Sequence, residues 1–160
     1  MKLFYRWILV VFLAVFFGCQ QQQQILTEME KEAIKKEITN QFNQLVSAAN
    51  ASDADAWFEY YSKEKFLSTI AATDYYATRS AWGDTITYYF SIRERQHLES
   101  LEVRVHALTP SLALMTSEEN MEIWLKSGEH NKYKHVFTMI WKKEQDGWKI
   151  LHSHESSTEK

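Results

Sequence analysis

Two histidines, His152 and His154, lie one residue apart in the segment DGWKILHSHESS near the end of the sequence. Side chains two residues apart on a β-strand point to the same face, so both imidazoles would face one way. Imidazole can bind zinc, can transfer protons near neutral pH, or can line a cavity. A zinc site needs a third ligand nearby, and the register of the last hairpin places His135 beyond the end of the pair. We therefore predict no metal site and keep catalysis, pocket lining and a structural role open.

A carboxylate is the other candidate for acid–base chemistry. Asp74 could act as a base beside a tyrosine that donates to an enolate oxygen, and either histidine of the pair could do either job. Asp74, Asp84 and Glu119 fall in predicted loops or at the edges of predicted elements, where solvation or helix capping is the usual role. The sequence therefore assigns no buried carboxylate to a strand.

Composition narrows the classes of protein to consider. The chain has 160 residues, is 45% hydrophobic and has a formal net charge of −3, which is typical of one globular domain. It has no basic stripe, so we predict no nucleic-acid partner. Aromatic side chains make up 14% of the sequence, enough for both a core and a lined pocket. We predict a small hydrophobic or aromatic molecule as the ligand, and no cofactor.

Hydrophobic periodicity predicts three helices in the first half of the chain. Thr27–Glu30 has the order of a capping box. Apolar residues then recur at steps of three and four on one helical face, at Ile34, Ile38, Phe42, Leu45, Val46 and Ala49. Ser52 or Asp53 can cap a second, shorter helix, and Thr78 or Ser80 can cap a third.

From Ser100 onward the hydrophobic period changes to two, which predicts four long strands. They are SLEVRVHAL, LALMTSEENMEIWL, KYKHVFTMIWKKE and WKILHSHES. The apolar parity of the second strand shifts near Glu119, and we interpret this shift as a bulge. KFLSTI (65–70) adds a short extra strand, and a loop follows through Asp74. Helices followed by antiparallel strands indicate an α+β fold.

The parity of the last hairpin predicts which face is buried. A two-residue loop at Asp146 and Gly147 pairs Gln145 with Trp148 and places Trp141 opposite His152. One face is then aromatic and faces the helices, whereas the other suits a subunit contact or solvent. Together with aromatic residues from other elements, this face gives the predicted pocket lining: Trp57, Tyr60, Tyr61, Tyr76, Trp82, Trp124, His135, Phe137, Met139, Trp141, His152 and His154.

The N-terminal segment has the features of an export signal. Two positive charges precede an apolar run of about 11 residues, too short to span a bilayer, and Gly18 and Cys19 follow it. This resembles the bacterial lipoprotein signal, which implies lipid attachment at Cys19. We predict a signal peptide at 1–18, a polar tether at 19–25, one domain at 26–157 and a tail at 158–160. The domain would then be anchored to a membrane of the bacterial cell envelope and face the periplasm or the exterior.

The segment HVFTMIWKKEQDGWKILHSHESS resembles the closing hairpin of SnoaL-like domains, within the nuclear transport factor 2-like superfamily. SDADAWFEYYS is similar to the second helix of that family. The resemblance implies a cone, in which three N-terminal helices pack on a curved antiparallel four-stranded sheet plus a short extra strand. It also implies an apolar cavity at the wide end and a homodimer formed through the outer sheet face. Relatives include polyketide cyclases, steroid isomerases, dehydratases and an assembly domain.

Three functions fit these observations. The first is binding of a small apolar or aromatic ligand by a membrane-anchored domain. The second is a cofactor-independent isomerase, cyclase or dehydratase that uses a pocket His or Asp as acid–base. The third is a structural dimer or assembly module. An enzyme should place a carboxylate or His of shifted pKa, together with a donor, deep in the pocket. A binder should have an apolar cavity with histidines only at its rim, and an assembly module should have a filled cavity.

Overall fold

The computed structural model describes residues 25–159. The elements are α2 (Glu28–Asn50), α3 (Ala54–Phe58), β1 (Ser68–Ala71), β2 (Asp74–Tyr76), α4 (Arg79–Ile92), β3 (Arg93–Thr109), β4 (Leu112–Leu125), β5 (His130–Glu144) and β6 (Gly147–Glu159). The predicted signal peptide, Cys19 and most of the tether lie outside the described residues. None of the helices between residues 25 and 159 combines the length and apolar character that a membrane crossing requires.

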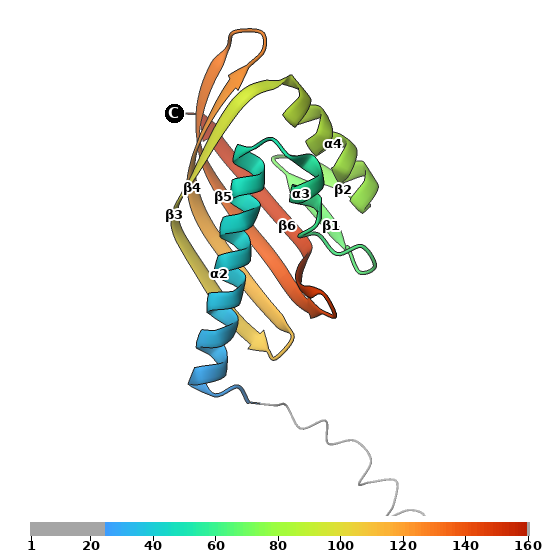
Figure 1. The fold of residues 1–160 in the computed structure, drawn as a ribbon, viewed down its shortest axis with the longest axis vertical. Helices are drawn as coiled ribbons and strands as arrows, with labels where there is room; N and C mark the ends of the chain where they lie inside the picture. Colours follow the sequence, from blue (N-terminus) through green and yellow to red (C-terminus); the bar gives the residue numbers. More distant parts are fainter. Residues whose placement is uncertain (1–24, 160) are drawn as a thin grey trace, which may run out of the picture.

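The described strands form one six-stranded mixed sheet in the order β2-β1-β6-β5-β4-β3. Strand β1 runs parallel to β6, and the other neighbours are antiparallel. The sheet curves around α2, and the β1–β2 hairpin, α3 and α4 lie together beside one end of that helix (Figure 1).

The α+β class is confirmed, but the prediction of three helices on an antiparallel four-stranded sheet is wrong. Only α2 is a long helix that lies along the sheet, and the sheet has six strands. The segment around Asp74, predicted as a loop, pairs with β1 instead. It does so because Ala72, with a φ of 53°, turns the chain back along the free edge of β1.

Local sequence signals set the helix ends. The Thr27 hydroxyl accepts a hydrogen bond from the Glu30 N–H, and the Glu30 carboxylate accepts one from the Thr27 N–H at 2.8 Å, so the predicted capping box is confirmed. Asp53 caps α3 and Thr78 caps α4 through their side chains. The buried stripe of α2 is close to the predicted one and consists of Ile34, Ile38, Phe42, Leu45, Ala48 and Ala49.

The last hairpin differs from the predicted register in two ways. Its turn lies at Gln145 and Asp146, and Gly147 opens β6 with a φ of 116°. Trp141 therefore pairs with Ile150 rather than with His152. An irregularity in the ladder then makes Leu151 an extra residue on β6, and beyond this bulge the side chains change face.

The bulge separates the two halves of β6. Trp148 and Ile150 face inward before it, and Ser153 and Glu155 face inward after it, whereas His152 and His154 turn to the outer side. The predicted inward orientation of the two histidines is therefore wrong. A bulge of one residue reverses the alternation, and no turn residue or proline marks it in the sequence.

Strand β4 runs without the bulge that we predicted near Glu119. Its register with β5 is unbroken, and its inward side chains alternate through Ala113, Met115, Ser117 and Glu119. The irregularity lies in the partner strand β3, between Ser100 and Glu102. Glu119 consequently occupies an inward position where an apolar side chain is usual.

Candidate functional site

A cavity of about 300 Å³ lies between α4, the β1–β2 hairpin and the inner face of the sheet. Its apolar walls include side chains from two helices and three strands, among them Trp57, Trp82, Ile86, Phe90, Leu98, Met121, Ile123 and Phe137. Its polar groups are Asp74, Tyr89, Arg93, Gln96, Tyr133, His135, Glu155, Ser156 and Ser157. The opposite end of the fold is filled by the fully buried Trp141 and Trp148, so the space is confined to one end.

His135 on β5 and Glu155 on β6 form the central polar contact of the cavity. The distance between Nε2 of His135 and Oε2 of Glu155 is 3.1 Å, and the two side chains are 8% and 14% exposed. The contact is diagonal, because Glu155 pairs directly with Phe137, two residues after His135. The second oxygen of Glu155, Oε1, has no hydrogen-bond partner among residues 25–159, and Glu155 lines the cavity.

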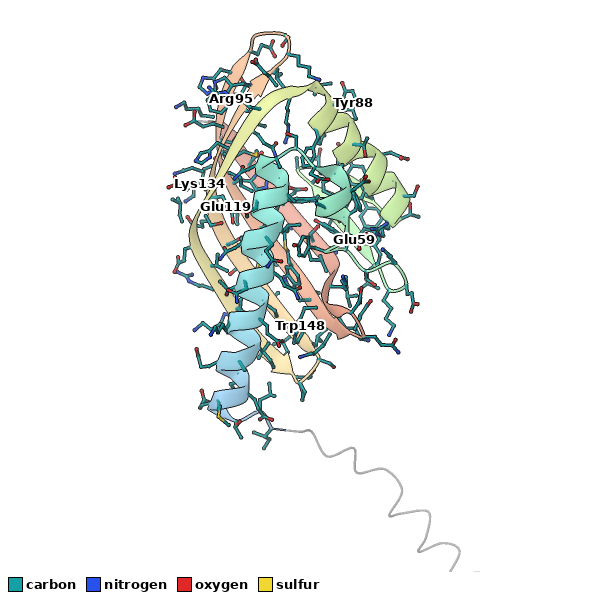
Figure 2. The ribbon with its side chains drawn as sticks, in the orientation of Figure 1. Glu59, Tyr88, Arg95, Glu119, Lys134 and Trp148 are labelled. Carbon is teal, nitrogen blue, oxygen red and sulfur yellow. The ribbon has the colours of Figure 1, made fainter. Side chains whose placement is uncertain are left out.

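Glu119, labelled in Figure 2, pairs directly with His135 in the β4–β5 ladder. It is fully buried, and neither carboxylate oxygen has a hydrogen-bond partner among residues 25–159. Burial raises the pKa of Glu119 to about 7, against the lowering effects of the nearby Ser117 hydroxyl and of His135; the charge of Glu155 adds to the rise. The imidazole of His135 thus lies between carboxylates from both neighbouring strands, and its Nδ1 is buried without a partner.

The cavity also holds a hydrogen-bond donor and a cation. Burial raises the pKa of Tyr89, and nearby Tyr76, Asp74 and Glu155 act in the same direction, so the Tyr89 hydroxyl keeps its proton. Burial lowers the pKa of the Arg93 guanidinium, an effect that the charge of Glu155 opposes. A proton acceptor, a phenolic donor and a guanidinium therefore share one space.

Residues 38–159 match the family model of the SnoaL-like domain. The chain belongs to the SnoaL-like domain family. Its α+β fold with a mixed sheet is the nuclear transport factor 2-like fold, as the solved structures below also show. No curated protein matches the chain.

Solved structures share the fold at low sequence identity. A proposed dehydratase of the nuclear transport factor 2-like family from Streptomyces avermitilis is 15% identical, with a TM-score of 0.71 over 80% of this chain and 98% of that one. A proposed scytalone dehydratase from Novosphingobium aromaticivorans is 8% identical, with a TM-score of 0.76 over 82% and 89%. A hexachlorocyclohexane dehydrochlorinase is 8% identical, with a TM-score of 0.70 over 84% and 93%. At these identities the likeness shows the fold alone.

In this SnoaL-like domain, five residues from the sequence-based candidates line the cavity. They are Trp57, Asp74, Trp82, His135 and Phe137. Tyr61, Met139 and Trp141 are buried in the core but do not line the space. Tyr60 does not line the cavity, and its hydroxyl donates to Gln44 at 3.0 Å. Tyr76 packs against the Trp82 ring of the cavity wall at a centroid distance of 5.1 Å. Trp124 lies on the other side of β4 from Ile123 and stacks on the His130 ring at 4.4 Å.

The histidine pair that first suggested chemistry lies outside the cavity. Nδ1 of His152 is 2.9 Å from the Ser68 hydroxyl and 3.1 Å from the Ser68 carbonyl oxygen, so His152 joins β6 to β1. His154 is exposed. Within residues 25–159, no cluster of three or more His, Cys, Asp or Glu side chains is arranged to hold a metal ion.

Sequence reasoning missed Glu119, Glu155 and Arg93. Strict alternation from Ala113 along β4 would have placed Glu119 on the inward face, because apolar residues occupy alternate positions of the strand both before and after it. No such signal identifies Glu155, because its face depends on the bulge at Leu151. Arg93 follows directly on α4, before the part of β3 that alternation marks as a strand.

Proposed function

We propose that this SnoaL-like domain is a cofactor-independent acid–base enzyme that catalyses elimination or isomerisation of a small molecule held in the cavity. The observation that carries the proposal is the His135–Glu155 contact of 3.1 Å, made by two nearly buried side chains that line an otherwise largely apolar cavity. A desolvated carboxylate–imidazole pair beside a hydrophobic binding space suits proton abstraction from carbon.

Each group has a role that its position supports. Glu155, through Oε1, takes a proton from a carbon next to a carbonyl group, and the C–H electron pair forms an enolate. The Tyr89 hydroxyl or the Arg93 guanidinium stabilises the oxygen that gains charge. In an elimination, the electron pair then forms the C=C bond and the group on the neighbouring carbon leaves, a halide as the anion, or a hydroxyl as water after it takes the proton held by Glu155. His135 holds Oε2 of Glu155 and pairs with Glu119 on the other neighbouring strand, so its ring is fixed between the two acidic side chains.

The names of similar structures agree with this class of reaction. Dehydratases remove water and a dehydrochlorinase removes hydrogen chloride, and both kinds occur among the proteins that share this fold. These names concern those proteins, and they support the proposal only as precedents for elimination in a cavity of this architecture.

The test measures proton exchange and elimination directly. The protein is incubated in D₂O with a set of small β-hydroxy and β-chloro ketones and acids, and NMR follows both C–H exchange and alkene formation. We expect turnover of at least one compound, and a loss of about 100-fold or more in His135→Gln and in Glu155→Gln. His152→Gln is the matched control, since this histidine lies outside the cavity. Equal rates in Glu155→Gln and the parent protein would refute the assignment.

Ligand binding without chemistry is the second candidate, and the apolar lining of the cavity favours it. In that case small aromatic compounds bind in the cavity, yet none exchanges protons or loses a leaving group. The same NMR experiment separates the two functions, because changes in chemical shift on addition of a compound report its binding whether or not a reaction follows.

We propose in addition that the chain is a lipid-anchored protein of the bacterial cell envelope. Support comes from the sequence order of positive charges, apolar run, Gly18 and Cys19. Cys19→Ser should move the protein from the membrane fraction to the soluble fraction of the cells that express it. Unchanged membrane retention of the Cys19→Ser variant would contradict lipid attachment at this residue.

A homodimer through the outer sheet face is also proposed. Val136, Leu101 and Leu108 on the long strands are exposed apolar side chains, and such side chains favour contact with a second copy. Native mass spectrometry tests this proposal, and a single monomer peak at micromolar concentration would contradict it.

A further inference from the structure

Arg93 is the one guanidinium group among the described residues that lines the cavity. It lies at the junction where α4 ends and β3 begins. Arg95, two residues later, lies on the outer side of the same strand, with its guanidinium 3.6 Å from the Trp124 ring centroid (Figure 2). The chain therefore provides one arginine inside the cavity and a close neighbour outside it.

Neutral groups hold the Arg93 side chain in place. Its Nη1 donates a hydrogen bond to Oε1 of Gln96, and Nε2 of Gln96 donates to the carbonyl oxygen of Ala49. The guanidinium carbon lies 5.5 Å from the Tyr89 ring centroid and 5.8 Å from that of Phe90. Because Gln96 is fixed by the end of α2, the guanidinium has a defined position before any ligand enters.

No carboxylate neutralises this cation. Among residues 25–159, none lies within the 4.0 Å of an ion pair with Arg93, and the cavity's Glu155 is hydrogen bonded to His135 instead. Burial lowers the pKa of the guanidinium, and the nearby charge of Glu155 opposes this effect without forming an ion pair. A half-buried arginine whose direct contacts are an amide and aromatic rings gains from an anion, and its forked N–H groups fit a carboxylate.

We propose that Arg93 is an anion-binding residue and that the molecule held in the cavity is a small organic acid. Its carboxylate contacts Arg93, and its apolar body packs against Trp82, Ile86 and Phe90. The inference rests on the proposed function because it uses the same cavity, and it narrows the substrate class of that function. It concerns binding alone, so it holds whether or not a reaction follows.

The experiment compares acids with their uncharged amides. Benzoate, phenylacetate and cyclohexanecarboxylate are titrated into the protein alongside the three matching amides, and NMR chemical shifts give each affinity. We expect at least one acid to bind about tenfold or more tightly than its amide, as a hydrogen bond to a charged group provides. Arg93→Gln should remove this preference and leave amide affinity within about twofold, whereas Arg95→Gln should leave both affinities unchanged.

Two further results complete the test. Arg93→Lys keeps the charge without the fork, so it should retain part of the preference and should fold if the glutamine variant does not. The inference is overturned if no acid is preferred over its amide by the parent protein, or if Arg95→Gln reduces the preference as much as Arg93→Gln. An acid preference without any turnover would defeat the proposed enzyme alone, and turnover of ketones by a protein that binds no acid more tightly than its amide would defeat this inference alone.

Discussion

The buried carboxyl group of Glu119 should make the stability of this domain fall as pH rises. In the unfolded chain a glutamate loses its proton near its ordinary pKa of 4.5, whereas in the folded protein burial raises the pKa of Glu119 to about 7. Between these values the folded state retains a proton that the unfolded state has released. Below about pH 4.5 the Glu119 carboxyl group therefore does not reduce the free energy of unfolding. The reduction grows as pH rises and is complete once pH has risen through about 7.

The size of the effect follows from the change in pKa. At about 1.4 kcal/mol for each pH unit, a rise from 4.5 to about 7 corresponds to a loss of about 3 kcal/mol in the free energy of unfolding. No reduction for solvent screening applies, because Glu119 has no exposed surface. This loss is a large fraction of the stability of an ordinary domain, which is about 5–15 kcal/mol.

Glu119→Gln isolates this contribution, since the amide keeps the shape of the side chain and does not titrate. Urea unfolding of both proteins from about pH 4.5 to about pH 8 gives the stability difference at each pH, and titrating groups that do not interact with Glu119 cancel in it. We expect the variant to gain about 3 kcal/mol relative to the parent protein across this range. A difference that is constant with pH, or that changes in the opposite direction, would refute the reasoning.

His135 must be controlled for, because it faces Glu119 and lowers its pKa. The other groups that act on Glu119 are the Ser117 hydroxyl and the carboxylates of Glu155 and Glu118. In a His135→Gln background the lowering effect is lost, so the penalty at high pH should increase. Repeating the Glu119→Gln comparison in that background separates the carboxyl group from the imidazole.

Three other substitutions test the last hairpin, each by urea unfolding. Trp148→Ala should destabilise the fold by about 3–5 kcal/mol, because the ring is buried and its Nε1–H donates to Glu37 at 2.7 Å; a near-neutral result would contradict its inward position. His152→Ala should lower stability by about 1 kcal/mol through loss of the Ser68 contact, and an effect on cavity binding larger than that on folding would contradict its outward position. Gly147→Ala should destabilise by about 1–2 kcal/mol because Gly147 has a φ of 116°, and an unchanged midpoint would show that the turn differs from the one described.

The elements that sequence reasoning predicted well are those with local signals. Helix α2 has a capping box at Thr27 and a continuous apolar stripe, and both features depend on residues close together in the chain. The four long strands likewise follow from alternation and turn residues. The small β2 strand was missed because its three residues are held by pairing with β1, a contact that no local pattern encodes.

The candidate site was harder to predict because it depends on which face of the sheet each individual side chain points to. His135 and Phe137, which were expected on the inner face, do line the cavity, because β5 alternates without interruption. The bulge at Leu151 reversed the remainder of β6, so His152 and His154 were assigned to the face that Glu155 occupies. Glu119 was set aside because a charged residue on an inward face conflicts with the usual pattern, although such conflicts are expected at functional or strained sites.

The order of the sheet has a consequence for how the protein is made. Strand β6, the last of the described strands along the sequence, lies between β1 and β5, and among residues 25–159 no other ladder joins the β1–β2 hairpin to the remaining strands. A nascent chain that still lacks β6 therefore has two separate pieces of sheet, and Glu155, which is part of β6, has not yet been added opposite Phe137. The β1–β2 hairpin and the long strands can join into one sheet, and the cavity wall can be completed, only after β6 has been synthesised.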